Sequence, residues 1–243
     1  MAPLKIISLN IEGDNHLHRI IPFFKKENAD VLCLQEVLEK DIPFIKSELN
    51  MDGLYKPLMY IRHPNPARLS VGTNWGILTL TKEKSEMNGE NYVKQGSDIP
   101  FNDPYEPNSC DRAIITAKII KDSIQYTVIN THFTWSVQGE STQLQLEHLE
   151  TMFKLLDPKK EFILCGDFNA PRGKPTWQRL SEKYTDNVPA HEITSIDPDL
   201  HRVKTIKFFV DGIFATQKYK AHVQVCSGVS DHKALIGIIT RAP

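Results

Sequence analysis

The sequence predicts an α/β protein in which two mixed β-sheets pack face to face with helices on the outside. Three observations lead to this class. Residues 4–34 read as strand, helix and strand, which is the size of a right-handed βαβ unit with parallel strands. Alternating apolar and polar residues farther along the chain indicate antiparallel hairpins. Strand-like segments also outnumber helical ones, and two layered sheets accommodate that mixture.

Composition supports one globular domain, residues 1–243, with 40% hydrophobic and 24% charged residues. The formal net charge of -1 argues against a protein that only coats nucleic acid, because such binding relies on an excess of Lys and Arg. The total charge does not reveal a local basic rim around a site, because it says nothing about where the charges lie. The four cysteines form no C-x-x-C pair, and Cys33 and Cys165 lie in apolar runs as buried thiols.

The chain shows no signal peptide and no apolar run of the roughly 20 residues that a membrane span needs. We therefore expect a cytoplasmic protein without a membrane span, and we expect a monomer.

In the first half of the chain, short β-branched runs predict strands and one apolar face predicts a helix. Residues 37–49 are predicted to form a second helix, kinked at Pro43. Residues 87–108 are polar and rich in proline, which predicts a long surface loop. The predicted strands are 4–11, 31–34, 55–61 and 75–80, and the first helix is 18–28.

In the second half, residues 140–156 form the clearest helix, because apolar residues recur at helical spacing before Pro158. A turn at 121–123 joins two alternating segments into a predicted hairpin. The predicted strands are 112–120, 126–131, 162–165, 208–214, 222–226 and 234–239.

Polar groups that bind metal or move protons follow several of these strands. Asn10 and Glu36 end two parallel strands, so they should lie at the same sheet edge, where open α/β sheets bind ligands. His132 ends another strand. Asp167 and Asn169 follow a buried strand, where they either point to one side or form an Asx-turn.

Two further clusters complete the set. Asp211 lies in an apolar run, where a buried carboxylate needs a partner. Asp231 and His232 precede the last strand, and we expect Asp211 and His232 to satisfy one another. Taken singly, most of these residues would be unremarkable.

The segments SLNIEG, LQEV, NTHF, GDFNAP, VDGIF and SDH, in this order from residue 8 to residue 232, resemble the motif series of the endonuclease/exonuclease/phosphatase superfamily. That group includes deoxyribonuclease I-like enzymes, deadenylases, sphingomyelinases and inositol-polyphosphate 5-phosphatases. The resemblance implies a four-layer α/β sandwich and a metal-dependent phosphoric ester hydrolase.

The resemblance also implies roles for the residues. The metal would be Mg²⁺, replaceable by Mn²⁺, near Asn10, Glu36 and Asp231. Asp167 would bind or activate the attacking water, and Asn169 would hold the water and a phosphate oxygen. His232, oriented by Asp211, would contact the phosphate or act as general base. His132 would stabilise the developing charge or the leaving oxygen.

Substrate contacts are expected from Arg112 and Arg172, with Trp135 at the mouth of the site. The substrate is expected to be a phosphodiester, with nucleic acid slightly favoured. The alternatives are a sphingomyelinase-like or other lipid or small-molecule phosphoesterase, which the near-neutral charge supports, and a non-catalytic binding protein on the same fold. Other basic residues considered for the rim are Arg62, Arg68, Lys174, His201, Arg202 and Lys204.

Overall fold

The computed structural model describes residues 3–241, which form two six-stranded sheets packed face to face. The first sheet has the order β11-β12-β1-β2-β4-β3 and the second β5-β6-β7-β8-β10-β9. The first contains β1 (Leu4–Asn10), β2 (Val31–Leu38), β3 (Asp52–Ile61), β4 (Thr73–Thr81), β11 (Tyr219–Cys226) and β12 (Ala234–Arg241). The second contains β5 (Glu86–Val93), β6 (Arg112–Lys121), β7 (Ile124–His132), β8 (Ile163–Asp167), β9 (Thr185–Asp186) and β10 (Asp211–Ala215).

Each sheet is mixed. In the first, β1 is parallel to β2 and antiparallel to β12. In the second, β7 is parallel to β8 and antiparallel to β6. The predicted class of two mixed sheets with outer helices is confirmed.

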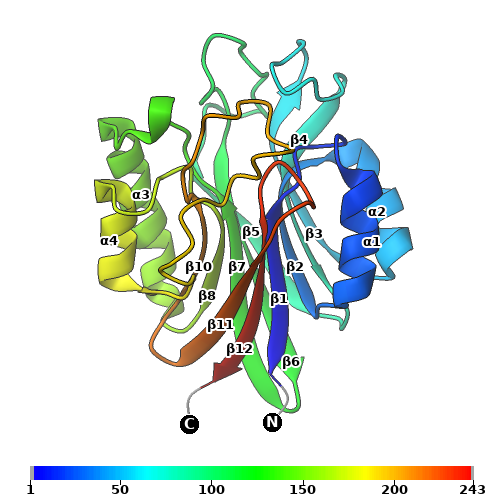
Figure 1. Cartoon of the computed structure of the whole chain (residues 1–243), viewed down its shortest axis with the longest axis vertical. Coiled ribbons are helices and arrows are strands. Elements are labelled where there is room, and N and C mark those ends of the chain that lie inside the picture. Colours follow the sequence, from blue (N-terminus) through cyan, green and yellow to red (C-terminus); the bar gives the residue numbers. More distant parts are fainter. Residues whose placement is uncertain (1–2, 242–243) are drawn as a thin grey trace.

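Helices cover the outer face of each sheet (Figure 1). Helices α1 (Leu17–Glu27) and α2 (Ile42–Leu49) flank the first sheet, and α3 (Gln143–Leu156) and α4 (Pro175–Lys183) flank the second. The described termini lie at the lower end of Figure 1, and the loops that carry the site lie at the upper end. No helix within residues 3–241 has the length and apolar character to cross a membrane.

Strand β1 (LKIISLN) is buried on both faces, which explains why apolar residues occupy neighbouring positions such as Ile6 and Ile7. Leu4 and Ile6 belong to the core between the sheets, whereas Ile7 and Leu9 pack in the cluster that includes Phe24 of α1. This burial holds the carboxyl end of β1, and Asn10 with it, in a defined position.

A buried amide network joins the two sheets below the site. Asn130 of β7 donates from Nδ2 to the backbone oxygens of Leu34 and Leu78, each at 3.1 Å. Its Oδ1 accepts from Gln35 Nε2 at 2.7 Å, and both side chains are fully buried. Because Gln35 precedes Glu36, the network also fixes the strand that presents Glu36.

The prediction of a helix over residues 37–49 is confirmed for residues 42–49 but is wrong for residues 37–41 and for the kink at Pro43. Strand β2 continues to Leu38, a short 3-10 turn (Glu39–Asp41) follows, and α2 begins only at Ile42. Pro43 stands in the first turn of α2. A proline there removes no helical hydrogen bond and so causes no kink.

The prediction of a loop over residues 87–108 is wrong in its first part. Residues Glu86–Val93 form β5, which pairs with β6 at the edge of the second sheet. An edge strand that is only partly buried lacks the continuous apolar signal of a central strand. Strand β10 begins at Asp211 rather than at residue 208, α3 begins at Gln143 rather than at residue 140, and neither α4 nor β9 was predicted.

Candidate active site

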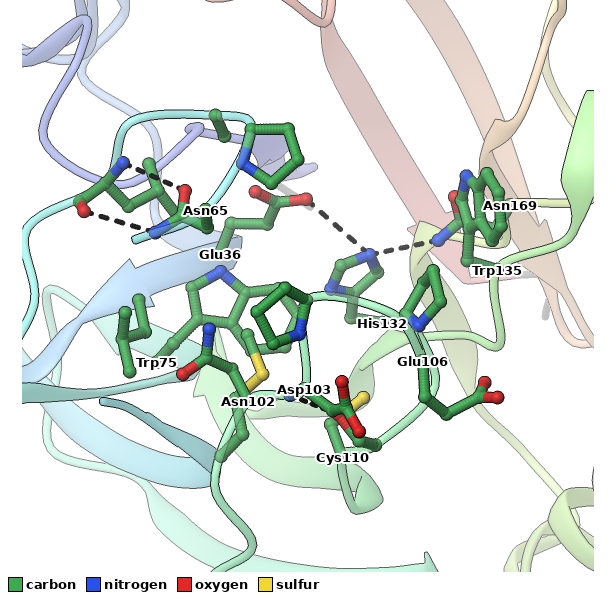
Figure 2. A pocket seen from close by; sticks show the side chains of 18 of the residues that line it. Glu36, Asn65, Trp75, Asn102, Asp103, Glu106, Cys110, His132, Trp135 and Asn169 are labelled. Atoms are coloured by element: carbon green, nitrogen blue, oxygen red, sulfur yellow. Dashed lines mark hydrogen bonds and ion pairs between the residues drawn. The ribbon is translucent and has the colours of Figure 1, made fainter. Parts of the chain in front are cut away.

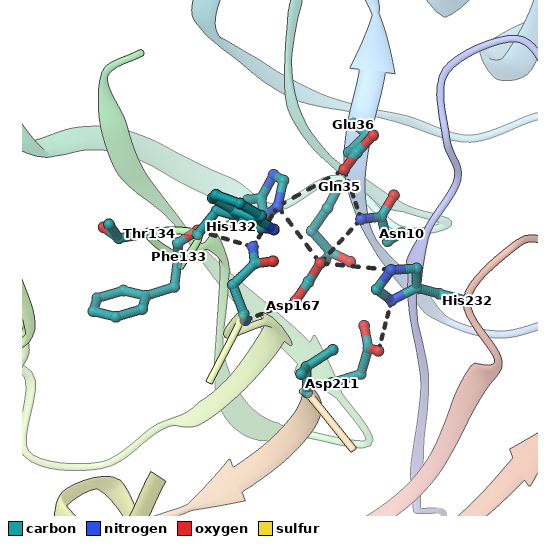
Figure 3. Close-up of polar contacts among 12 residues, drawn as sticks. Asn10, Gln35, Glu36, His132, Phe133, Thr134, Asp167, Asp211 and His232 are labelled. Carbon is teal, nitrogen blue, oxygen red and sulfur yellow. Dashed lines mark hydrogen bonds and ion pairs between the residues drawn. The ribbon is translucent and has the colours of Figure 1, made fainter. Parts of the chain in front are cut away.

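The predicted catalytic side chains gather at one end of the two sheets, and both sheets contribute (Figure 3). Asn10 ends β1 and Glu36 lies near the end of β2, whereas His132 ends β7 and Asp167 ends β8. Backbone pairing aligns His132 with Asp167, and Asp167 with Asp211 at the start of β10.

Glu36 projects from an irregularity in β2. The register against β4 shifts between Leu34 and Val37, and Glu36 has a φ of 60°. A bulge of this kind redirects a side chain beside an active site. Asn10 Nδ2 donates to Glu36 Oε1 at 2.9 Å and to Asp167 Oδ2 at 3.0 Å, so one amide orients both carboxylates.

Asp167 is buried at the centre of the site. Its Oδ1 accepts the backbone N–H of Asn169 at 2.8 Å, which is the Asx-turn considered from the sequence. Its Oδ2 lies 3.5 Å from His132 Nε2 and 3.9 Å from His232 Nε2. Burial raises the pKa of Asp167, but the charges of His232 and His132 outweigh it and hold the pKa well below its usual range.

His232 and Asp211 form the expected pair. His232 Nδ1 donates to Asp211 Oδ2 at 2.8 Å, and both side chains are buried. Burial lowers the pKa of His232, yet Asp211 and Asp167 on its two sides raise it well above 6.5. The two carboxylates thus favour the protonated ring, whose Nε2 lies 3.9 Å from Asp167 Oδ2 at the centre of the site.

His132 closes the opposite side. Its Nε2 lies 3.0 Å from Asn169 Nδ2 and 3.9 Å from Glu36 Oε1. The ring of Trp75 packs against it, with centroids 5.1 Å apart. Asn169 Nδ2 also donates to the backbone oxygen of Phe133 at 3.1 Å, which holds the amide beside the imidazole.

Asp231 lies in an acidic part of the site together with Glu12. The pKa of Asp231 is raised to about 7, mainly by burial and further by the carboxylates of Glu12 and Glu36, which together outweigh the lowering by His232 and Arg202. Glu12 is buried; it accepts from Arg202 Nη1 at 2.7 Å and lies 3.0 Å from His16 Nε2.

The structure brings to the site residues that the sequence left without a firm role, and it places Arg202, one of the rim candidates, beside Glu12. From the sequence, Glu12 was considered for a supporting role beside the metal without being assigned one, and His16 was not interpreted as a zinc ligand. Arg202 lies on the long segment between β9 and β10, whose sequence predicts no regular structure. Trp75 was predicted to lie in a strand, with its ring either stacking on a base or packing in the core, and the structure packs it against His132. An Arg202–Glu12 contact across 190 positions leaves no local signal in the sequence.

The three predicted substrate contacts lie in different places. Trp135 is 39% exposed and lines both cavities described below, consistent with a position at the mouth. Arg112 reaches the larger cavity, but its guanidinium donates to the backbone oxygen of His132 and to Asn108 Oδ1.

Arg172 is not brought to the site. Its guanidinium forms bonds with both carboxylate oxygens of Asp186, each at 3.1 Å, and stacks over Phe209 with its Cζ 4.7 Å from the ring centroid. In this structure Arg172 holds the segment after β9 in place.

Two cavities meet at Glu36. The smaller of the two, which we call the reaction cavity, has a volume of about 160 Å³. The other, which we call the side cavity, has a volume of about 380 Å³ and extends between the loops after β3 and β5 (Figure 2). Glu36, Trp135, Asn169 and Arg202 line both. The reaction cavity is also lined by Asp167, Asp231 and His232.

Residues 7–232 match the model of the Endonuclease/Exonuclease/phosphatase family. An endonuclease/exonuclease/phosphatase from Bacteroides vulgatus is 17% identical over 100% of both chains, with a TM-score of 0.71. The human Nocturnin catalytic domain with bound sulfate is 15% identical over 99% of this chain and 94% of that one, with a TM-score of 0.70.

A mannosyl-6-phosphatase from Bacteroides thetaiotaomicron is 14% identical over 98% of this chain and 99% of that one, with a TM-score of 0.66. At such identities the likeness of these structures establishes a common fold. No curated protein sequence matches the chain.

Proposed function

The chain belongs to the endonuclease/exonuclease/phosphatase family of phosphoester hydrolases, and from this premise we propose that it hydrolyses phosphodiesters with Mg²⁺ as its metal. The observation that carries the proposal is the reaction cavity, where Asp167, Asn169, Asp231 and His232 face Glu36. Water would attack phosphorus, one P–O ester bond would break, and an alcohol and a phosphomonoester would leave.

The donor set fits a hard divalent cation. Glu36 and Asp231 supply carboxylate oxygens, which Mg²⁺ prefers. Glu36, Glu12 and burial all raise the pKa of Asp231, so a cation beside it would relieve the repulsion that the site builds up. When bound, the metal would offset negative charge on the phosphate oxygens.

Asn10 supports the metal site in a different way from that expected. Its Oδ1 accepts the backbone N–H of Glu12 at 3.1 Å, and its nitrogen faces Glu36 and Asp167. We assign it to orienting these two carboxylates, while the ligands would be Glu36 and Asp231.

The remaining side chains divide the work around the phosphate. Asp167, whose low pKa keeps it ionised, would accept a hydrogen bond from the attacking water and orient it. His232, protonated and held by Asp211, would donate from Nε2 to a phosphate oxygen rather than act as general base. Asn169 and His132 would stabilise the oxygens on the opposite side.

Nucleic acid was slightly favoured from the sequence and stays a candidate substrate. A strand would need several cations along its phosphates. At the cavities, however, the guanidinium of Arg112 is bonded within the protein and that of Arg202 pairs with Glu12. These contacts favour a compact phosphodiester. The four cysteines are free, which supports the cytoplasm as the proposed location.

The test is hydrolysis of bis-p-nitrophenyl phosphate with Mg²⁺, with Mn²⁺ and with EDTA, beside p-nitrophenyl phosphate as a monoester. Asp167→Asn and His232→Ala should each lower kcat by at least about 100-fold, while circular dichroism and melting temperature show a folded protein. Asp157→Asn, which changes an exposed carboxylate far from the site, is the matched control. Full activity in both site variants would refute the assignment.

A further inference from the structure

The side cavity begins where the reaction cavity ends. Glu36 and Asn169 line both, so a phosphoester seated among the catalytic groups would have one substituent directed into the larger space. In Figure 2 Glu36 and His132 lie at the inner end of this space, and Trp75 lies alongside. A volume of about 380 Å³ is large enough for an organic group of considerable size.

The lining of the side cavity is largely apolar. The loops after β3 and β5 supply prolines and aliphatic side chains, and two indole rings complete the wall. The principal apolar residues are Met59, Ile61, Leu69, Trp75, Pro107 and Trp135. Burial of apolar surface is therefore the main interaction that this space offers.

Two amide side chains of the lining, Asn65 and Asn102, hold the loops. Asn65 bonds to the backbone N–H and oxygen of Leu69, at 3.0 and 3.2 Å. Asn102 Oδ1 accepts from the backbone N–H groups of Arg62 and His63, and its Nδ2 donates to the oxygen of His63. These two amides therefore have few unused donors and acceptors for hydrogen bonds to a ligand.

The charges of the lining disfavour an anionic occupant. Asp103 and Glu106 contribute carboxylates, whereas the guanidinium of Arg112 is bonded to Asn108 and to the backbone of His132. A second phosphate placed here would meet the carboxylates of Glu36, Asp103 and Glu106. The cations that line the cavity are Arg112, whose donors are used within the protein, and Arg202, which pairs with Glu12.

We propose that the side cavity binds an apolar organic substituent, alkyl or aryl, of the phosphoester whose phosphorus is attacked in the reaction cavity. This inference rests on the proposed function and names its substrate class: phosphoesters with one bulky apolar group. Neither a sugar-phosphate chain nor a strongly polar substituent fits the engaged amides and the acidic groups of the lining.

The experiment measures binding of methyl-, butyl- and octylphosphonate to the whole chain by calorimetry, with Mg²⁺ present. Each methylene that enters the cavity should tighten binding by up to about fourfold, until the space is filled. Equal affinity for the three compounds, or failure of all three to bind, would overturn the inference.

A substitution in the wall of the side cavity tests whether the alkyl chain binds there. Ala67 lines the side cavity on a partly exposed loop, and only its backbone oxygen is bonded, to Asn15 Nδ2 at 3.0 Å. Ala67→Glu should lower the ratio of octyl- to methylphosphonate affinity by at least about tenfold, because a carboxylate enters the apolar wall. Ile120→Glu adds the same charge on a side chain that is 66% exposed on β6, and should leave the ratio unchanged.

Hydrolysis of bis-p-nitrophenyl phosphate, measured on the same samples, separates the two proposals. Hydrolysis with no dependence of affinity on chain length would refute the apolar pocket alone. Absence of metal-dependent hydrolysis would refute the proposed function, and the chain-length series would then still decide whether the cavity binds apolar groups.

Discussion

At the scale of single residues, His232 owes its protonation to two buried carboxylates. Asp211 accepts from its Nδ1 at 2.8 Å, and Asp167 lies beyond its Nε2 at 3.9 Å. A histidine buried in an apolar pocket would instead lose its proton, because burial alone lowers its pKa. The pair therefore determines whether the ring can donate to a phosphate.

Asp211→Asn should lower the pKa of His232, because the burial penalty stays while the largest compensating charge is removed. NMR titration of the imidazole in metal-free protein measures this. His148, whose pKa is lowered by burial, serves as an internal reference that should not move. An unchanged His232 pKa in the variant would contradict the pairing.

The same pair has a consequence for stability. Because the pKa of His232 is raised in the folded state, the pair contributes its full amount to the free energy of unfolding below about pH 6.5. That contribution disappears as the pH rises through the raised pKa. The loss of unfolding free energy in Asp211→Asn should accordingly be larger near pH 6.5 than above that raised pKa.

A second prediction at this scale concerns Asn130, whose amide joins the two sheets. Asn130→Leu would leave Leu34 O, Leu78 O and Gln35 Nε2 without this partner, and should cost about 3 kcal/mol of unfolding free energy in urea. Thr116→Val is the matched control, because Thr116 Oγ1 is buried with no partner among the described residues. Removing that hydroxyl should be neutral or stabilising.

At the scale of elements, Gly166 gives β8 a backbone conformation in which a side chain would collide with β7. A Cβ there would lie 2.1 Å from the backbone oxygen of Thr131, and Gly166 has a φ of 156°. The glycine thus allows the close parallel pairing that places Asp167 beside His132.

Gly166→Ala should therefore destabilise the protein by at least about 3 kcal/mol and should lower kcat by displacing Asp167. Thermal unfolding and hydrolysis of bis-p-nitrophenyl phosphate measure the two effects. Gly96→Ala, where a Cβ would meet nothing within 4 Å, should change neither. Equal melting temperatures for the two variants would contradict this account of the strand spacing.

Elements with a one-sided or fully buried apolar pattern were predictable from the sequence, and those held by distant partners were not. Strand β1 and helix α1 carry their patterns locally. Strand β5 is polar because it lies at a sheet edge, and its pairing with β6 is what makes it a strand. The short helix α4 contains Trp177, whose burial depends on contacts with β10 and Phe209.

The same division applies to the site. The Asp211–His232 pair was predictable, because a carboxylate in an apolar run needs a partner. The ion pair of Glu12 with Arg202 was not, since it depends on the path of the long segment before β10. Nor was the position of Arg172, which the sequence placed near the substrate and the structure places on Asp186.

At the scale of the whole molecule, the net charge of -1 gives little long-range attraction for an anionic substrate. We expect kcat/KM for a small phosphodiester to change less than about threefold between 50 and 300 mM salt. Steady-state kinetics at several salt concentrations measure this. A loss of tenfold or more with single-stranded DNA as substrate would instead support nucleic acid, because counterion release makes that binding steeply salt-dependent.

Both sheets supply catalytic groups, and β1 lies between β2 and β12, which come from opposite ends of the chain. During synthesis on the ribosome, β1 and β2 emerge early, whereas His232 and β12 come last among the described elements. A nascent chain still missing them has an open sheet edge beside β1 and lacks the imidazolium of the site. A chain without residues 219–241 would therefore lack both the strand that covers β1 and the histidine that faces Asp167.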